Sequence, residues 1–210
     1  MSAPFILFNP FVILPLNGMN TSFYKIFRKK RNIIIGVIHF PPLLGYPDFP
    51  SLDAALKNAL RDLKAFEDGG VDGVIFENNY DIPHKEFVDP PIIASMAILG
   101  KEIRKKTKLP LGVNVLWNDY RVSLSLAKLL NLQFIRVPVF VDKVRASCGV
   151  IEGNPQAVLK TRRDLKAEQV AIFTDIHVKH AVLVSRDTIR ASASLAKKYQ
   201  ADAVIVTGKW

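Results

Sequence analysis

Six short apolar runs, each followed by a helical pattern, constrain the fold of this chain more than any other feature of its sequence. The runs are nearly continuous in apolar residues and rich in β-branched ones, which is typical of strands buried on both faces. Strands that alternate with helices in this way form parallel sheets with right-handed crossovers. The sequence predicts strands at residues 32–39, 74–76, 111–116, 133–140, 170–176 and 203–206.

Local signals mark where several helices begin and end. Ser51 is the predicted N-cap of a helix that the glycines at 69–70 terminate. Asn154 and Pro155 suit the N-cap and the first position of a later helix. Ser185 is the predicted N-cap of the last helix. Two further helices are expected at residues 91–106 and 121–130.

Both a (β/α)₈ TIM barrel and an open doubly wound sheet fit six βα steps. No G-x-G-x-x-G motif follows the first predicted strand, which disfavours the dinucleotide-binding open sheet. Polar residues follow nearly every strand, as they do on the active-site face of a barrel. We therefore predict an α/β fold of the (β/α)₈ TIM-barrel type with only about six of its eight βα units present. The chain is then expected to be a fragment or an incomplete barrel with two exposed strand edges.

Residues 1–31 form a predicted arm, hydrophobic and then basic, ahead of an incomplete barrel domain over residues 32–210. The apolar stretch 3–17 is shorter than the roughly 20 residues that a transmembrane helix needs, and prolines interrupt it. Its positive charge follows the apolar part, unlike that of a signal peptide. Met19 is a second methionine, so we expect residues 1–18 to be untranslated. The alternatives are a membrane-associating arm and a signal anchor.

The net charge of +10 is concentrated at the amino-terminal end, where residues 25–31 carry five Lys and Arg. This basic run is short and has no interleaved aromatic residues, so we interpret it as solvated rather than as a nucleic-acid site. The single cysteine, Cys148, excludes an intramolecular disulfide and is interpreted as a loop thiol. We expect a cytoplasmic protein, with peripheral membrane contact through the arm as the alternative. Open strand edges also make a homo-oligomer a candidate.

The densest polar clusters follow the second and fifth predicted strands. Glu77 beside Asn78 suits general-base work or cation binding. In an extended strand, Asp175, His177 and Lys179 would share one face, so that the carboxylate fixes the imidazole tautomer and the lysine holds a phosphate. A divalent metal held by Glu77, Asp175 and His177 is an alternative. The predicted catalytic residues are Glu77, Asp175, His177 and Lys179.

Four further residues at strand ends are predicted to bind substrate. His39 ends the first strand, Asn114 lies inside the third, and Arg136 lies inside the fourth. Asn78 beside Glu77 completes the set. A structural role is the alternative for these side chains, as a packed histidine, a capped turn or an interior hydrogen-bond hub.

Several blocks of the sequence, in order and at matching spacing, resemble the BtpA/SgcQ family. The similarity runs from about Ile33 to the last residue. It implies a (β/α)₈ barrel related to phosphate-binding barrels. The blocks are GVIHFPPLLGYP (36–47), ENNYDIPH (77–84), GVNVLWND (112–119), FIRVPVF (134–140), GVIEGNP (149–155), DIHVKHA (175–181) and ADAVIVTG (201–208). The residues matching the family pattern are His39, Glu77, Asn114, Asp175, His177 and Lys179.

The resemblance implies less about function than about fold. The family's namesake is a cyanobacterial photosystem I biogenesis factor associated with thylakoid membranes, and another member lies among bacterial sugar-uptake genes. Because archaeal and animal members also exist, the resemblance implies a barrel derived from an enzyme acting on a phosphorylated small molecule, a sugar or a nucleotide. The alternatives are a non-catalytic assembly or stability factor of the photosystem I biogenesis type and a truncated product without independent activity. Whether the chain is an enzyme is left open at this point.

Two residues depart from the family pattern. Trp117 stands where arginine is usual, and Pro138 stands where asparagine is usual. Inside the fourth predicted strand, Pro138 would remove a ladder donor and weaken any substrate site at that strand's end.

Overall fold

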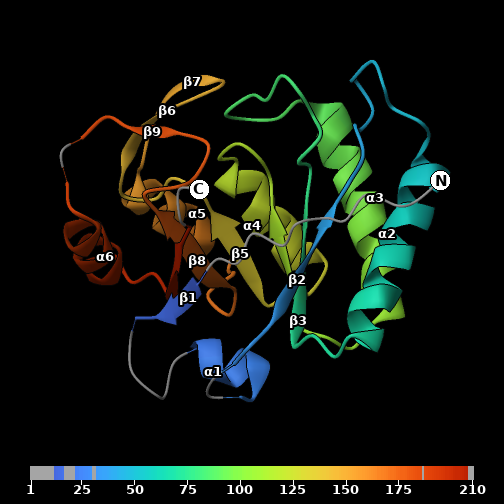
Figure 1. Cartoon of the computed structure of the whole chain (residues 1–210), viewed down its shortest axis with the longest axis horizontal. Helices are drawn as coiled ribbons and strands as arrows, with labels where there is room; N and C mark the ends of the chain where they lie inside the picture. Colours follow the sequence, from blue (N-terminus) through green and yellow to red (C-terminus); the bar gives the residue numbers. More distant parts are fainter. Residues whose placement is uncertain (1–11, 17–21, 30–31, 186, 208–210) are drawn as a thin grey trace.

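A computed structural model describes residues 12–16, 22–29, 32–185 and 187–207. Its main sheet has seven strands in the order β1-β10-β8-β5-β4-β3-β2, and Figure 1 shows that the sheet is curled. The six predicted strands are all present, and they pair in parallel in the order of the sequence. They are β2 (Ile35–His39), β3 (Gly73–Glu77), β4 (Leu111–Asn114), β5 (Phe134–Val137), β8 (Ala171–Ile176) and β10 (Ala203–Val206).

Part of the predicted arm joins this sheet. Strand β1 (Val12–Pro15) pairs antiparallel with β10, so β1 and β2 are the end strands within the described residues. The suggested start at Met19 and the residues before Val12 lie outside the described ranges.

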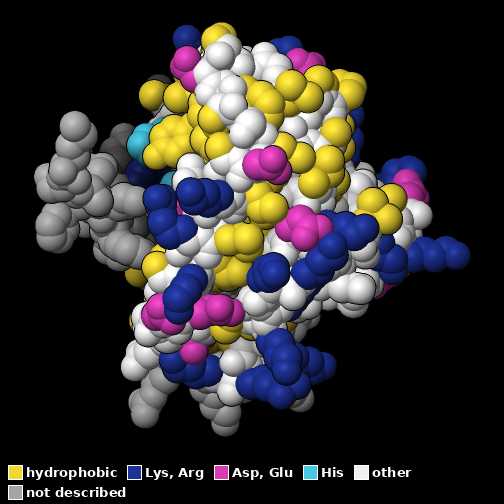
Figure 2. All heavy atoms as spheres, turned by 90° about the vertical axis from the view of Figure 1, so that its right-hand side faces the viewer, with side chains coloured by type: hydrophobic (Ala, Val, Ile, Leu, Met, Phe, Trp, Pro, Cys, Tyr) yellow, Lys and Arg dark blue, Asp and Glu magenta, His cyan; other side chains and the backbone are white. Residues whose placement is uncertain are grey.

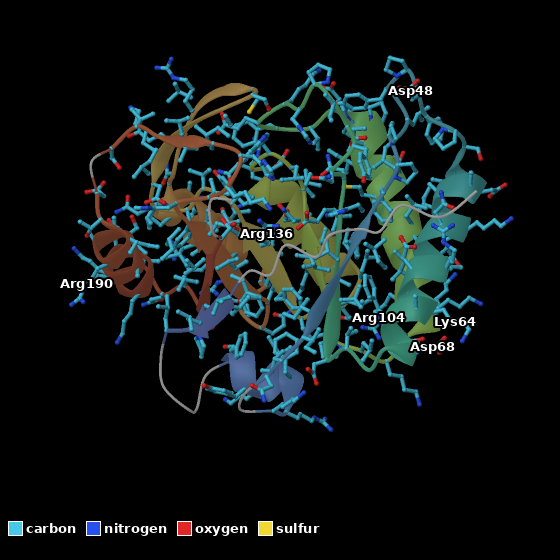
Figure 3. The ribbon with its side chains drawn as sticks, viewed as in Figure 1. Asp48, Lys64, Asp68, Arg104, Arg136 and Arg190 are labelled. Atoms are coloured by element: carbon cyan, nitrogen blue, oxygen red, sulfur yellow. The ribbon has the colours of Figure 1, made fainter. Side chains whose placement is uncertain are left out.

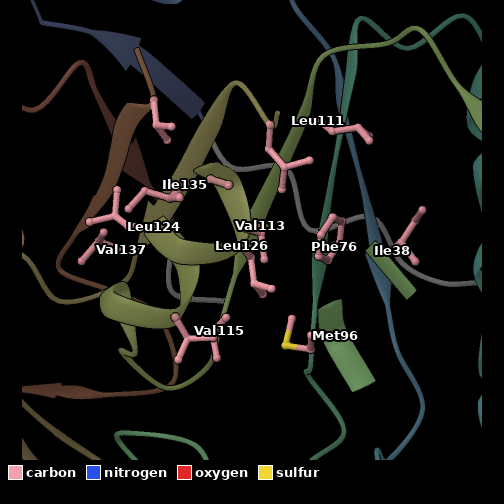
Figure 4. Packing of buried hydrophobic residues seen from close by; sticks show 14 of the residues in the cluster. Ile38, Phe76, Met96, Leu111, Val113, Val115, Leu124, Leu126, Ile135 and Val137 are labelled. Atoms are coloured by element: carbon pink, nitrogen blue, oxygen red, sulfur yellow. The ribbon is translucent and has the colours of Figure 1, made fainter. Parts of the chain in front are cut away.

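Helices cover the outer face of the curled sheet, as alternation of strands and helices requires. The helices are α1 (Ser22–Phe27), α2 (Leu52–Asp68), α3 (Pro90–Lys106), α4 (Tyr120–Leu129), α5 (Pro155–Asp164) and α6 (Ile189–Lys198). Figure 4 shows the outer-face side chains Ile38, Phe76 and Val113 beside Met96 of α3 and Leu126 of α4. These side chains are at most 2% exposed and belong to the main hydrophobic cluster.

The predicted N-caps are confirmed at two helices and wrong at a third. Ser51 Oγ accepts a hydrogen bond from the Ala54 amide, and Asn154 Oδ1 accepts one from Ala157. Helix α6 begins at Ile189, so Ser185 lies too far upstream to cap it. Thr188 is the cap, and its hydroxyl accepts from the Ala191 amide at 3.2 Å.

Pro138 lies outside the sheet, contrary to the prediction. Strand β5 ends at Val137, one residue earlier, so the missing amide of Pro138 costs no ladder hydrogen bond. Trp117 is 6% exposed and lies in a buried cluster with Val139 and Val178.

Aromatic side chains fill the inner side of the curled sheet. Phe134 and Phe173 stack with ring centroids 4.6 Å apart, and helix α1 closes the amino-terminal end of the strands with Phe23 and Phe27 against them. Gly112 makes room for this packing, because a Cβ there would lie 2.1 Å from the Phe134 ring. Among the described residues, the inner layers towards the amino-terminal end of the strands are therefore apolar, and the polar inward-facing side chains lie at the carboxyl end.

A second, three-stranded sheet lies beyond the carboxyl ends of the main strands. It consists of β6 (Lys143–Ala146), β7 (Gly149–Glu152) and β9 (Val182–Leu183) in the order β7-β6-β9. Val144 and Ile151 pack with Trp117 and Val178 beneath it. These three strands were not predicted from the sequence.

The surface over α2 and α3 is charged at one end and more hydrophobic at the other. Figure 2 shows Lys, Arg, Asp and Glu side chains over its lower part and more hydrophobic side chains towards the top, beside a histidine. The loops that follow β2 and β3 carry the exposed hydrophobic residues Leu44, Tyr80 and Ile82. Within the described ranges, no helix is both long and apolar enough to cross a membrane.

Candidate active site

The last inward-facing residues of the parallel strands form one polar layer. His39 of β2 is in register with Glu77 of β3, and Glu77 is in register with Asn114 of β4. Arg136 of β5 and Asp175 of β8 extend this layer. Since side chains alternate along a strand, these five residues meet on the inner side at the carboxyl end. We call them the strand-end cluster.

Arg136 bridges the two carboxylates of the cluster. Its Nε and Nη2 donate to Asp175 Oδ1 and Oδ2 at 2.8 and 2.9 Å, and its Nη1 donates to Glu77 Oε1 at 2.8 Å. Figure 3 shows Arg136 at the centre of the molecule, whereas the ion pair of Lys64 and Asp68 lies at its outer edge. The Arg136 side chain is 14% exposed, and those of Glu77 and Asp175 are at most 4% exposed.

His39 and Asn114 complete the surroundings of Glu77. Asn114 Nδ2 donates to Glu77 Oε1 at 3.2 Å, and His39 Nε2 lies 3.6 Å from Glu77 Oε2. The His39 side chain is 37% exposed, so it connects the buried carboxylate with the outside. Asn114 Oδ1 is buried and has no hydrogen-bond partner among the described residues.

The two carboxylates differ in their electrostatics. Burial alone would raise the pKa of Glu77, but the charge of Arg136, the neighbouring His39 imidazole and the hydrogen bond from Asn114 lower it from 4.5 to about 2. Burial raises the pKa of Asp175, and the negative charge of Glu77 adds to this effect although Arg136 opposes it. Glu77 therefore stays ionised throughout the neutral range.

The low pKa of Glu77 predicts a pH-dependent contribution to stability. Because the folded-state pKa is lowered, the contribution is complete above pH 4.5 and is lost as the pH falls towards about 2. It amounts to about 3 kcal/mol in total, of which about 1 kcal/mol is lost by about pH 3.5. Urea unfolding at about pH 6 and about pH 3.5 should therefore show a smaller loss for Glu77→Gln than for the wild type. Glu152→Gln, at an exposed glutamate, is the control, and equal losses in all three proteins would refute the ionised, buried Glu77.

The segment after β8 does not continue as a strand. Strand β8 ends at Ile176, and His177 and His180 have positive φ values of 52° and 66°. Asp175, His177 and Lys179 therefore do not share one strand face as the sequence predicted. Among the described residues no hydrogen bond or ion pair joins Asp175 to His177, whose Nε2 is buried without a partner.

Basic side chains nevertheless lie beside the cluster. Partial burial lowers the pKa of His180, and the nearby charges of Lys179 and Arg136 lower it further. The segment 177–180 thus brings His177, Lys179 and His180 to the same end of the barrel as Arg136.

Asn78 joins neighbouring loops at the carboxyl end. Its Oδ1 accepts from the Leu116 amide at 2.7 Å, and its Nδ2 donates to the Leu116 carbonyl at 3.3 Å and to Asp81 Oδ2 at 3.0 Å. Asp81 in turn accepts from the Leu43 amide at 2.8 Å. Both polar atoms of the Asn78 carboxamide are thus engaged within the protein, and its predicted substrate contact stays a prediction.

Two more buried side chains repeat this arrangement. Asn118 exchanges hydrogen bonds of 2.9 Å with both the amide and the carbonyl of Val139. Asp142 accepts from the His177 amide at 2.8 Å and from Ser192 Oγ at 2.6 Å. Asn78, Asp81, Asn118 and Asp142 therefore hold successive loops around the cluster, and we call them the rim clamps.

Asp81 and Asp142 were not among the predicted site residues. They are buried acids four and five residues beyond the ends of β3 and β5, in YDIP and FVDK respectively. An acid that closes an apolar run was a usable signal at Asp142, but its partners lie 35 and 50 residues away.

Metal-binding geometry is not found in the described part of the chain. No group of three or more His, Cys, Asp and Glu there could hold a metal ion. The carboxylates of Glu77 and Asp175, which the sequence offered as metal ligands with His177, are engaged by Arg136 instead.

A curled parallel sheet with inward-facing charged residues at its carboxyl end defines a protein of the TIM-barrel type. The solved structure of 7,8-dihydropteroate synthase from Vibrio fischeri, a TIM barrel, is similar in fold, with a TM-score of 0.50 and 13% identity. The similarity covers 71% of this chain and 47% of that one. The chain belongs to the BtpA family, whose profile matches residues 30–210.

Relatives come from archaea, cyanobacteria and animals. An uncharacterized protein of Thermococcus kodakarensis is 38% identical, with 86% of this chain and 69% of that protein covered. The photosystem I biogenesis protein BtpA of Synechocystis is 35% identical, with 84% of this chain and 62% of that protein covered. An uncharacterized mitochondrial protein of Caenorhabditis elegans is 36% identical, with 88% and 70% covered. The chain thus spans about two thirds of the length of these relatives.

Proposed function

We propose that this protein is a small-molecule enzyme that acts on a phosphorylated sugar or nucleotide by general acid–base catalysis. The observation that carries the proposal is the strand-end cluster, in which Glu77, Arg136 and Asp175 are buried together. Buried ion pairs add little net stability compared with apolar packing, so a charged network at the carboxyl end of a barrel favours a functional origin.

His39 is the proton-transferring residue of this proposal. Its imidazole is partly exposed, and its Nε2 faces Glu77. An Nε2–H that donates to the ionised carboxylate leaves Nδ1 as a proton acceptor for substrate. Glu77 then fixes the tautomer and stabilises the imidazolium that forms, while Arg136 and Asn114 hold Glu77 in place.

The anionic group of the substrate binds away from the two carboxylates. Glu77 and Asp175 offset the charge of Arg136, so the floor of the site does not attract phosphate. The segment 177–180 offers His177, Lys179 and His180 beside it, and an ammonium group is a suitable point charge for phosphate.

Calorimetric titration tests the phosphate preference directly. We expect ribose 5-phosphate or AMP to bind about 10-fold or more tightly than ribose or adenosine, because a charge-assisted hydrogen bond contributes about 1.5–3 kcal/mol. Lys179→Ala should remove that preference, whereas Lys64→Ala on the exposed face of α2 should keep it. Equal binding of each phosphorylated compound and its unphosphorylated partner would refute the proposed substrate class.

The name of the Synechocystis relative favours a second candidate, a role in the assembly of a membrane complex. Such a role depends on a surface that binds other proteins and does not require proton transfer. It predicts that Glu77→Gln, at a side chain that is only 4% exposed, leaves function intact.

A further inference from the structure

Asp142 lies outside the strand-end cluster yet is joined to the segment that carries the proposed phosphate-binding residues. It is 5% exposed and follows β5 along the chain. Its Oδ2 accepts from the His177 amide at 2.8 Å, and its Oδ1 accepts from Ser192 Oγ of α6 at 2.6 Å. One buried carboxylate therefore ties the segment after β8 to helix α6.

The segment 177–180 needs such an anchor. His177 and His180 have left-handed backbone conformations, which non-glycine residues rarely adopt and which cost free energy. Two hydrogen bonds from backbone amides hold the segment, one from His177 to Asp142 and one from Lys179 to Thr207 Oγ1 at 3.1 Å. Val178 between them is 6% exposed and packs into the cluster that includes Trp117 and Val144.

We propose that Asp142 is a positioning residue, which sets the conformation of segment 177–180 so that His177 and Lys179 face the bound phosphate. The proposal rests on the function proposed above and adds a residue that touches no substrate. Ser192 of α6 donates to the other oxygen of this carboxylate. The Asp142 side chain therefore links the position of α6 to that of His177. Preorganisation of this kind lowers the entropic cost of binding, because the segment is ordered before the ligand arrives.

Two measurements on Asp142→Asn test this role. The asparagine keeps the shape of the side chain but has only one acceptor oxygen for the two donors, His177 N–H and Ser192 Oγ–H. We expect amide hydrogen exchange at His177 to become about 10-fold faster. We also expect the dissociation constant for inorganic phosphate to rise about 10-fold at a temperature well below unfolding. Ser125→Ala, which removes the matched helical hydroxyl bonded to the Arg121 carbonyl, should change neither quantity.

Ser192→Ala gives the second variant in case Asp142→Asn does not fold. It removes one of the two hydrogen bonds of the Asp142 carboxylate. The exchange rate of the His177 amide and the dissociation constant for phosphate should each rise about threefold. A folded variant with unchanged phosphate affinity overturns the positioning role, even if exchange at His177 is faster, because Asp142 is then only structural. If the wild type binds no phosphate, the proposed anion site fails, and unchanged exchange at His177 would separately refute the anchoring by Asp142.

Discussion

Arg136→Met is expected to destabilise the protein by about 3–5 kcal/mol. The substitution removes the cation between Glu77 and Asp175 and leaves two carboxylates buried without their partner. In a chain of this size that loss lowers Tm by about 6–20 °C. Thermal unfolding followed by circular dichroism measures it.

Two controls separate this mechanism from loss of packing. The triple variant Glu77→Gln, Asp175→Asn, Arg136→Met removes all three charges and should regain most of the stability, since well-packed neutral replacements of buried ion pairs are often tolerated. Lys64→Met breaks the exposed pair with Asp68 and should cost less than about 0.5 kcal/mol. An Arg136→Met protein as stable as the wild type would mean that the carboxylates are not held as described.

Phe173→Ala is the second substitution with a large expected effect, also about 3–5 kcal/mol. Phe173 is 1% exposed, stacks on Phe134 and lies 5.4 Å, centroid to centroid, from the ring of Phe23 in α1. Its removal opens a cavity in the inner layer and loosens the helix that closes the amino-terminal end of the strands. Chemical unfolding in urea gives the free energy of unfolding.

Phe87→Ala is the matched control for this prediction. Phe87 is 38% exposed, and its main contacts are Arg121 over its ring and Tyr120 at its edge. Its loss should cost about 1 kcal/mol or less. Equal losses for the two phenylalanines would show that α1 and Phe134 do not enclose Phe173.

The parallel sheet could be predicted because its signals are local. Each strand is a continuous apolar run. A helix between two consecutive strands allows them to lie parallel, so a parallel sheet is expected. The carboxyl-end positions of His39, Glu77 and Asp175 followed from the strand boundaries alone.

The contacts within the site could not be predicted in the same way. Arg136 was assigned to substrate, but it lies between Glu77 and Asp175, which are 59 and 39 residues away in sequence. His177 was placed by strand alternation, whereas the chain turns there with a positive φ, and the His177 amide donates to Asp142. Such long-range hydrogen bonds depend on tertiary packing, which the periodicity of apolar residues along the sequence does not predict.

Product analysis tests the central claim, that the strand-end cluster carries out proton-transfer chemistry on a phosphorylated small molecule. Wild-type protein and Glu77→Gln are each incubated with a mixture of sugar phosphates and nucleotides, and the compounds are followed by mass spectrometry. We expect the wild type to convert at least one phosphorylated compound, and Glu77→Gln to bind it but convert it at least about 100-fold more slowly. Conversion at the same rate by both proteins, or by neither, would contradict it.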